Sequence, residues 1–266
     1  MPTKVPDVSA GDLPRTGTQA ISRAVMVLKE VSTRGKFGWR MSDLADRCGL
    51  DRATTHRILS CLVRERMITQ RDEDRHYLPG PLLYEMGLAV PRYVGFQNAC
   101  APVLRRLVKR FGGFSLAHVR SDTESICVAR AGASVYVGNP MDVGSRWPLC
   151  ASAGGVAMLI ELPPEERQRI WEQNLTQLRG RGRGAIGALK AMIRQSETLG
   201  FAFNRGQTAT GVVAVACPVF DGRNCVFGSL VLVGLDQNVS ESSVLELVKA
   251  VRREAEVLMN GMAQAS

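Results

Sequence analysis

The sequence lacks several features that would assign it to a membrane, secreted or nucleotide-hydrolysing class. No uncharged apolar run approaches the ~20 residues that a membrane helix needs, which excludes a spanning segment. The motif Gly-x-x-x-x-Gly-Lys-Ser/Thr does not occur, so the common phosphate-binding loop is absent. Residues 1–17 hold no apolar segment of the secretory type. We interpret them as a disordered tail and expect a cytoplasmic protein with no membrane partner.

Histidine and paired cysteine are also scarce. The chain has 3 histidines and 7 cysteines, and no two cysteines have the Cys-x-x-Cys spacing of zinc sites. We therefore expect no metal and no cofactor. The cysteines are interpreted as reduced, mostly buried thiols of a cytosolic protein.

The composition of the whole chain is typical of a globular, basic protein. The 266 residues are 45% hydrophobic and 22% charged, with a formal net charge of +9. That length allows about two domains of ~100–150 residues each. A basic chain favours polyanionic partners only weakly, and the charge is spread over both halves. A nucleic-acid partner therefore has to rest on a motif.

The first 80 residues show the pattern of three helices. Apolar residues recur at helical spacing over 20–32 and over 52–66, with a shorter helix between them. We expect Ser42 to cap the short helix, Gly49 to end it in a left-handed conformation, and Asp51 to cap the third helix.

Two helices joined by a turn that contains glycine, the second with an arginine-rich outer face, are typical of a helix-turn-helix. Strand-like segments at 68–71 and 76–78 would make it winged. The second helix must fit a groove about 12 Å wide, so its exposed residues must be compact, hydrogen-bonding or cationic. The residues of this type, with candidates on the wing, are Ser42, Arg52, Ala53, Thr54, His56, Arg57, Arg71 and Arg75. The alternative is a small packed subdomain whose arginines form a solvated face.

The second half mixes helices and strands. Helices are expected at 82–88, 101–111, 154–160, 166–174, 186–199 and 240–259, and strands at 114–119, 125–130, 134–138, 211–220 and 226–235. The last two strands are joined by Asp221-Gly222, which is typical of a hairpin turn.

Motifs in both halves resemble one family. They are Gln19-x-x-x-Arg23-Ala24, Leu44-Ala45, Gly49-Leu50, Thr54-x-His56-Arg57-Ile58-Leu59, Tyr77-x-x-Gly80-x-x-Leu83-x-x-x-Gly87, Gly144-x-x-x-Pro148-Leu149-x-Ala151-Ser152-Ala153-Gly154, Leu199-Gly200-Phe201 and Val215-Ala216-x-Pro218-Val219. With them the chain resembles the IclR family of bacterial transcriptional regulators from Thr18 to Met259.

The resemblance implies an α+β fold with two domains and no enzymatic activity. A winged helix-turn-helix would occupy 18–80, a linker helix 81–96, and a GAF-like effector-binding domain with an antiparallel sheet 97–262. The implied partners are a palindromic double-stranded DNA operator, a small organic effector and further copies of the chain, as a dimer or tetramer. Activation and repression both stay open.

The resemblance also places an effector pocket around the 148–154 loop, the 200–205 region and the two late strands. This chain departs from the family pattern by placing Val231 and Val233 where other members have Ser-x-Ser, and Ala214 and Asn204 where they have Cys-like and Asp-like positions. Each change removes a polar partner, so we predict an apolar effector such as an aromatic acid. The candidate effector contacts are Trp147, Leu149, Ala151, Ser152, Ala153, Gly154, Asn204, Val212, Ala214, Val231 and Val233. Backbone N–H groups at the helix start after Ala151 would attract a carboxylate.

Other interpretations stay open. The two valines are also consistent with an ordinary buried strand and an unliganded pocket. A hydrolase could use Ser152 or Cys150, with His118 and either Asp142 or Asp221 as partners. An interaction protein with degenerate DNA-binding and effector sites is the remaining alternative.

Overall fold

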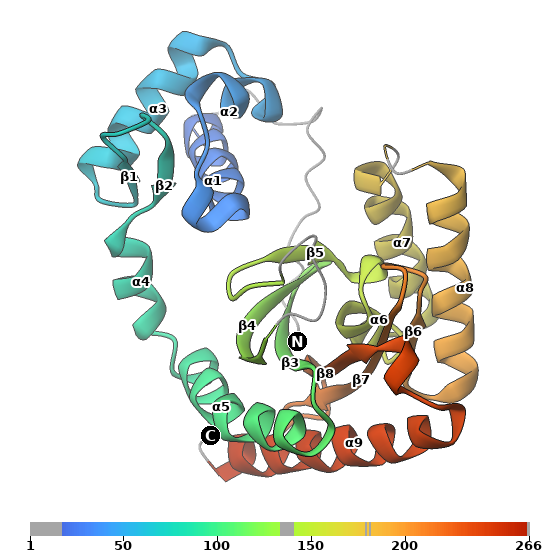
Figure 1. The fold of residues 1–266 in the computed structure, drawn as a ribbon. Coiled ribbons are helices and arrows are strands. Elements are labelled where there is room, and N and C mark those ends of the chain that lie inside the picture. The colour runs from blue at the N-terminus through green and yellow to red at the C-terminus, as the bar shows by residue number, and fades with distance from the viewer. Residues whose placement is uncertain (1–17, 134–140, 179, 181, 265–266) are drawn as a thin grey trace. The chain divides into compact units, whose positions relative to one another are not determined.

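The computed structural model describes residues 18–133, 141–178, 180 and 182–264, and the chain divides into two compact units between Ala89 and Val90 (Figure 1). The expected tail at 1–17 and the expected strand at 134–138 lie outside the described residues. The expected α+β class, with a helix-turn-helix before an antiparallel sheet, is confirmed.

The first unit consists of short helices and one hairpin. Its helices are α1 (Gln19–Val31), η1 (Ser32–Phe37), α2 (Met41–Cys48), α3 (Arg52–Arg64) and α4 (Pro81–Leu88), and its strands are β1 (Ile68–Gln70) and β2 (Tyr77–Pro79). Apolar side chains from α1, α2, α3 and the hairpin meet in one core that includes Val31, Leu44, Leu59, Ile68 and Tyr77. Helix α1 and the hairpin therefore pack against the helix-turn-helix and stabilise it.

The ends of α2 and α3 follow from capping chemistry. Gly49 ends α2 at φ 61° and ψ 34°, as predicted, because glycine adopts the left-handed conformation without a Cβ clash. Asp51 caps α3 through its Oδ1, which accepts a hydrogen bond from the Thr54 N–H at 2.8 Å. The prediction for Ser42 is wrong: α2 begins at Met41, so Ser42 lies in the first turn, and its hydroxyl donates to Asp43.

The hairpin has a third strand-like neighbour that the sequence did not indicate. Trp39 pairs with Tyr77 through two backbone hydrogen bonds of 3.0 and 2.8 Å. The Trp39 ring is buried, and the guanidinium of Arg34 lies 3.7 Å from its centre. This pairing attaches the hairpin to the segment that leads into α2.

The expected single linker helix over 81–96 is instead two helices. Ala89 ends α4 in the first unit, and α5 (Pro91–Phe111) begins two residues later and lies within the second unit. Pro91 explains both boundaries, because a proline disfavours helical backbone at the residue before it and suits the first helical position. The expected helix at 101–111 is thus the second half of α5.

The second unit is built on one antiparallel sheet. Its strands are β3 (Phe114–Ser121), β4 (Glu124–Gly132), β5 (Arg146–Pro148), β6 (Ala202–Arg205), β7 (Val212–Phe220) and β8 (Val226–Leu235), in the spatial order β5-β4-β3-β8-β7-β6. The other elements are α5, η2 (Leu149–Ala151), α6 (Ala153–Leu159), α7 (Pro164–Leu178), α8 (Arg183–Leu199), η4 (Asp236–Asn238) and α9 (Glu241–Gln264). The edge strand β6 was not predicted, because four residues are too short to show an alternating pattern.

Helices cover both faces of this sheet (Figure 1). Alternate residues of β8 divide between the two cores: Leu230 and Leu232 pack with α5 and α9, whereas Val231 and Val233 pack on the side of α6 and α8. Because both faces are buried, β7 and β8 are apolar at nearly every position instead of alternating with polar residues.

None of the helices formed by the described residues is long and apolar enough to cross a membrane. The seven cysteines form no disulfide, and Cys100, Cys127, Cys150 and Cys217 are buried. Burial raises the pKa of the Cys100 and Cys127 thiols to about 12. These two thiols are therefore protonated and unreactive at neutral pH.

Candidate functional sites

The first candidate site is the outer face of α3. Arg52, Ala53, His56 and Arg57 are exposed on it, whereas Thr55, Leu59 and Leu62 point into the core. Thr54 is half-buried, and the guanidinium of Arg57 reaches its hydroxyl at 3.4 Å. Helical periodicity thus places the predicted contact residues of this helix on one accessible face.

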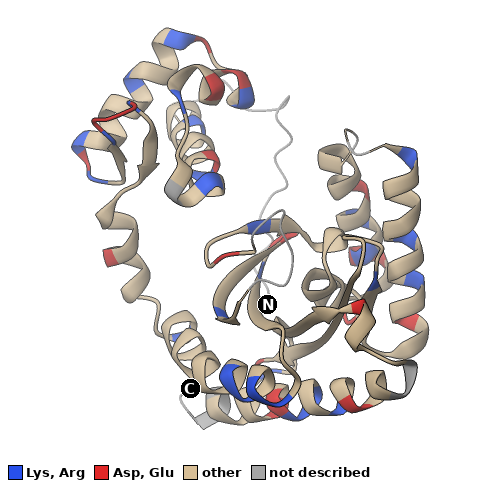
Figure 2. Ribbon diagram, in the orientation of Figure 1, with Lys and Arg blue, Asp and Glu red and all other residues tan. Residues whose placement is uncertain are grey.

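The charge on this face is of one sign. The helix carries three arginines and no acidic residue between Arg52 and Arg64, and its arginines are blue in Figure 2. The carboxylate at the start of α3 is Asp51, whose pKa is lowered by hydrogen bonds from the backbone and side chain of Thr54, and Glu65 at the other end of the helix pairs with Arg64. Asp51 is therefore occupied in capping, and the cationic side chains at the start of α3 stay available for an anionic partner.

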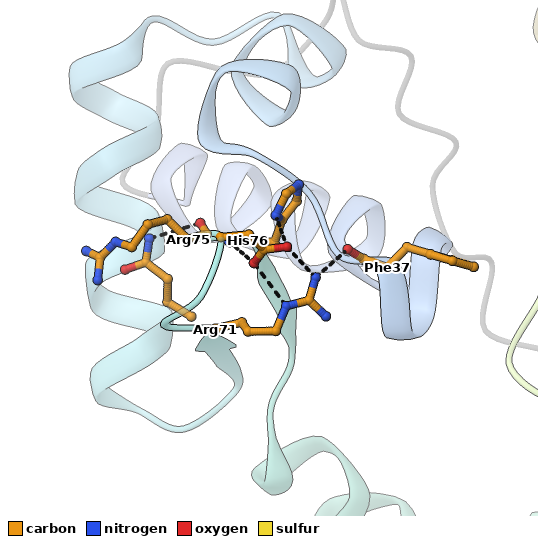
Figure 3. A network of polar contacts seen from close by, with 6 residues as sticks. Phe37, Arg71, Arg75 and His76 are labelled. Atoms are coloured by element: carbon orange, nitrogen blue, oxygen red, sulfur yellow. Dashed lines mark hydrogen bonds and ion pairs between the residues drawn. The ribbon is translucent and has the colours of Figure 1, made fainter.

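The second feature is a cluster in the hairpin loop, which we call the wing clamp: Arg71, Asp74, His76 and the carbonyl of Phe37. Figure 3 labels Arg71, His76 and Phe37 of this cluster. The carboxylate of Asp74 accepts hydrogen bonds from Arg71 Nε at 2.9 Å and from the second guanidinium nitrogen at 2.6 Å. It also accepts from the His76 N–H at 3.1 Å, and His76 Nδ1 lies 2.6 Å from it. Arg71 further donates to the Phe37 carbonyl at 3.2 Å.

The wing clamp divides the predicted wing residues into two kinds. Arg71 is engaged with Asp74 and Phe37, so it shapes the loop and fastens it to the end of η1. The hydrogen bond from Arg71 lowers the pKa of Asp74, which keeps the clamp charged over the whole neutral range. The backbone of Arg75 is in the left-handed region, with φ 59°, and its carbonyl accepts a hydrogen bond from Gln70 Nε2 at 3.1 Å. Its side chain extends away from the wing clamp (Figure 3). Sequence reasoning missed Asp74, although acidic residues between two arginines are a signal for such a pairing.

The third feature is a cavity in the second unit, between β3, the start of α6 and strands β6 to β8. Its volume is about 30 Å³, enough for one water-sized group. The lining residues are Phe114, His118, Met141, Ser152, Ala153, Gly154, Asn204, Thr208, Ala209, Val212, Ala214, Val231 and Val233. Eight of the predicted effector contacts, Ser152, Ala153, Gly154, Asn204, Val212, Ala214, Val231 and Val233, line this one cavity.

The other three predicted contacts lie outside the lining. Trp147 is on β5 at the far edge of the sheet, paired with Ser125. Leu149 and Ala151 are buried in η2, which Asn174 holds by accepting the Cys150 N–H at 3.3 Å. The short 3₁₀ turn directs these side chains into the core, and no pattern in the sequence predicts this turn.

Most polar groups of the lining already have partners. Asn204 Oδ1 accepts from the N–H groups of Gln207 and Thr208 at 3.0 and 3.2 Å, and its Nδ2 donates to the Thr208 hydroxyl at 2.6 Å. Ser152 caps α6 by accepting the Gly155 N–H at 3.1 Å. Asn204 thus holds the loop beside the cavity, and little of its hydrogen-bonding capacity is left for a ligand.

Five residues of the lining were not predicted as effector contacts: Phe114, His118, Met141, Thr208 and Ala209. Of these five, His118 is the one with a titratable side chain. It is 1% exposed, and neither ring nitrogen has a hydrogen-bond partner among the described residues. Burial lowers the pKa of His118 to about 4, so the ring is neutral at pH 7. A lone histidine in a predicted strand gave no signal, because only the tertiary structure brings it to the start of α6.

The described residues do not assemble a hydrolase site. His118 and Ser152 line the same cavity, but Asp142 and Asp221 are each ion-paired with an arginine at 2.6 Å. No carboxylate orients the imidazole within the described part of the chain. Cys150 is fully buried in η2. No cluster of three or more His, Cys, Asp or Glu side chains that could hold a metal occurs among the described residues either.

Comparison with known proteins matches both units. The family model described as IclR helix-turn-helix domain matches residues 20–72, and the one described as bacterial transcriptional regulator IclR C-terminal matches residues 93–259. Transcriptional repressor IclR of Escherichia coli K12 is 23% identical over 259 residues, which cover 94% of this chain and 93% of that protein. HTH-type transcriptional repressor AllR of the same strain is 23% identical, with 90% of this chain and 88% of AllR covered.

Two solved structures have the same fold. An IclR-type transcriptional regulator from Silicibacter sp. TM1040 superposes with a TM-score of 0.77 at 21% identity, over 92% of this chain and 96% of that one. An IclR homolog from Microbacterium hydrocarbonoxydans, complexed with 4-hydroxybenzoate, gives a TM-score of 0.71 at 22% identity, over 93% and 100%.

Proposed function

Because the chain belongs to the IclR family of bacterial transcriptional regulators, we propose that α3 enters the major groove of operator DNA while the cavity of the second unit receives a small organic effector. The observation that carries the DNA-binding part is the exposed face of α3. It presents Arg52, His56 and Arg57 beside a capped helix start and has no acidic residue of its own. Arginine can bind guanine O6 and N7 with two hydrogen bonds, which suits these positions to base recognition.

The wing has a separate part in the proposal. Arg75, whose side chain extends away from the wing clamp, contacts the DNA backbone or the minor groove. Arg71 acts indirectly, because its guanidinium is held by Asp74 and the Phe37 carbonyl. Ser42, in the first turn of α2, exchanges its hydrogen bond to Asp43 for one to a phosphate.

The experiment is a gel-shift titration on the DNA that flanks the protein's own gene. Arg57→Ala is expected to weaken binding by ~1–3 kcal/mol, because it removes a base contact. Arg64→Ala is the matched control: Arg64 is exposed at the other end of α3 and pairs with Glu65, so its loss leaves affinity nearly unchanged. Equal affinities for the wild type and Arg57→Ala would contradict the proposed docking of α3.

The effector in this proposal is an apolar, aromatic acid. Its support is the lining of the cavity, in which Phe114, Val212, Val231 and Val233 supply apolar surface. One structural relative was crystallised with 4-hydroxybenzoate, an acid of this class. Since the cavity holds only a water-sized group, the effector has to widen it by moving Met141 or the loop from Gly206 to Gly211. The protein would then have a narrow and a widened conformation of the cavity, and the effector would bind the widened one more tightly. Effector control requires such a difference in affinity between two conformations.

The protein is further proposed to act in the cytoplasm as a dimer or tetramer on a palindromic operator. A single module buries little surface on DNA, whereas two linked modules add their affinities. Exposed apolar side chains on α1 and α4, among them Ile21, Tyr84, Met86 and Leu88, offer surface for a second copy. Light scattering during gel filtration tests this part, and a monomeric mass at operator-binding concentrations would contradict it.

A further inference from the structure

Among the described residues that line the cavity, His118 is the polar residue whose side chain has no hydrogen-bond partner. It lies on β3 directly over the start of α6, where a methyl group added at Gly154 would stand 2.2 Å from its Nδ1. The nearby Gly154 carbonyl already accepts a hydrogen bond from the Ser229 hydroxyl at 2.8 Å. Both imidazole nitrogens are buried and lack partners among the residues described. Burying a polar group without a hydrogen bond is unfavourable, so this arrangement needs a reason.

The groups around the ring supply neither a charge nor a proton. Helix α6 presents Gly154, and β8 presents Val231 and Ser229, the cross-strand partner of His118. On β4 the cross-strand partner is Cys127, whose pKa burial raises to about 12. Within the described lining of the cavity there is no Lys, Arg, Asp or Glu side chain.

An anion that enters such a cavity alone would be costly, because no cation balances it. An organic acid can enter only if one proton accompanies it, and His118 is the described lining group that can hold a proton near neutral pH. Protonation turns both ring nitrogens into donors, one of which can serve a carboxylate oxygen.

Resting on the effector-binding role proposed above, we propose that His118 is the polar anchor of the effector and that this effector is a small organic acid bound together with one proton. Solvent supplies the proton, the imidazole becomes imidazolium, and the resulting pair with the carboxylate is neutral overall. In the folded chain, burial lowers the pKa of His118 to about 4. The bound carboxylate raises the pKa of His118. Binding therefore takes up a proton at any pH between the pKa of the ring without the acid and its pKa beside the bound carboxylate.

The test is calorimetric titration of the full chain with benzoate, 4-hydroxybenzoate and the neutral isostere benzamide. Titrations at pH 6, 7 and 8 in buffers of different ionisation enthalpy give the number of protons taken up per ligand. We expect about one proton per acid and about tenfold weaker binding for each rise of one pH unit, since uptake of one proton changes log Kd by one per unit. Benzamide affinity is expected to be independent of pH.

Two variants separate His118 from its neighbours. His118→Asn keeps hydrogen-bonding groups but cannot be protonated, so it should abolish proton uptake and weaken acid binding at pH 6 at least tenfold. Cys127→Ala removes the other ionisable side chain beside the ring and should leave proton uptake intact. The circular dichroism spectra of both variants check that they fold.

Three results would overturn the inference: acid binding without proton uptake, uptake that survives in His118→Asn, or no binding of either acid at millimolar concentration. A gel shift on the same preparation distinguishes this failure from failure of the proposed function. If operator DNA is bound and the acids bind without proton uptake that depends on His118, only the role of His118 is refuted. If neither acid binds, the proposed aromatic-acid effector is refuted with it, while the DNA-binding part of the proposed function stands.

Discussion

The buried imidazole makes the stability of the second unit depend on pH in a defined direction. In the unfolded chain a histidine has its ordinary pKa of 6.5, whereas in the folded chain burial lowers the pKa of His118 to about 4. As the pH falls below 6.5 the unfolded chain therefore binds a proton that the folded chain does not. The contribution of His118 to stability is complete above that pH, is lost progressively between pH 6.5 and 4, and does not change further below pH 4.

The magnitude follows from the same two pKa values. One pKa unit corresponds to about 1.4 kcal/mol, so the fall from 6.5 to about 4 corresponds to about 3 kcal/mol of unfolding free energy. This is a large fraction of the ~5–15 kcal/mol that stabilises a typical domain. His118→Phe removes the titration and keeps an aromatic ring at the site. The unfolding free energy of this variant minus that of the wild type should therefore rise by this amount between pH 7.5 and pH 4.

Urea denaturation followed by tryptophan fluorescence measures this difference. Trp147 and Trp171 lie in the second unit, and a Trp39→Phe background removes the signal of the first unit. The titrations of surface carboxylates are common to both proteins, so they cancel in the comparison. The reasoning would be refuted if the difference in unfolding free energy between the wild type and His118→Phe stayed constant within about 0.5 kcal/mol from pH 7.5 to 4.5. It would mean that the ring has a partner or is reached by solvent.

Three further predictions concern other parts of the structure. Gly154→Ala should lower the unfolding free energy of the second unit by ~1–3 kcal/mol in urea titrations, because its Cβ would overlap His118; unchanged stability would show that the ring can move aside. Val231→Ser should weaken benzoate binding by ~1–3 kcal/mol in calorimetry, since it places an unpaired hydroxyl against an aromatic ring; tighter binding would indicate a more polar effector. Asp74→Ala should release Arg71 and weaken operator binding several-fold in gel shifts, with effector binding unaffected; a wing that tolerates this change would show that the clamp does not position Arg75.

Local sequence patterns determined the helices and strands wherever the signal was contained in neighbouring residues. The apolar period placed α3 almost to its ends, Asp51 and Gly49 marked its start and the end of α2, and β8 was predicted at its observed bounds, 226–235. The motifs that indicated the family are short runs of the same kind, and the family is confirmed by both halves of the chain. The prediction for Ser42 was wrong because serine is common both at the N-cap and in the first turn of a helix, and these positions are next to each other in the sequence.

The tertiary structure decided which residues meet. Arg71 and Asp74 are a local pair, but the Phe37 carbonyl that Arg71 also reaches lies 34 positions away, and no local pattern pairs a guanidinium with a distant carbonyl. Likewise, β3 and α6 are brought together only by the fold of the whole second unit, so the burial of His118 over Gly154 could not be predicted from either segment. Local propensity depends on adjacent side chains, whereas the solvation and pairing of a buried group depend on every element packed around it.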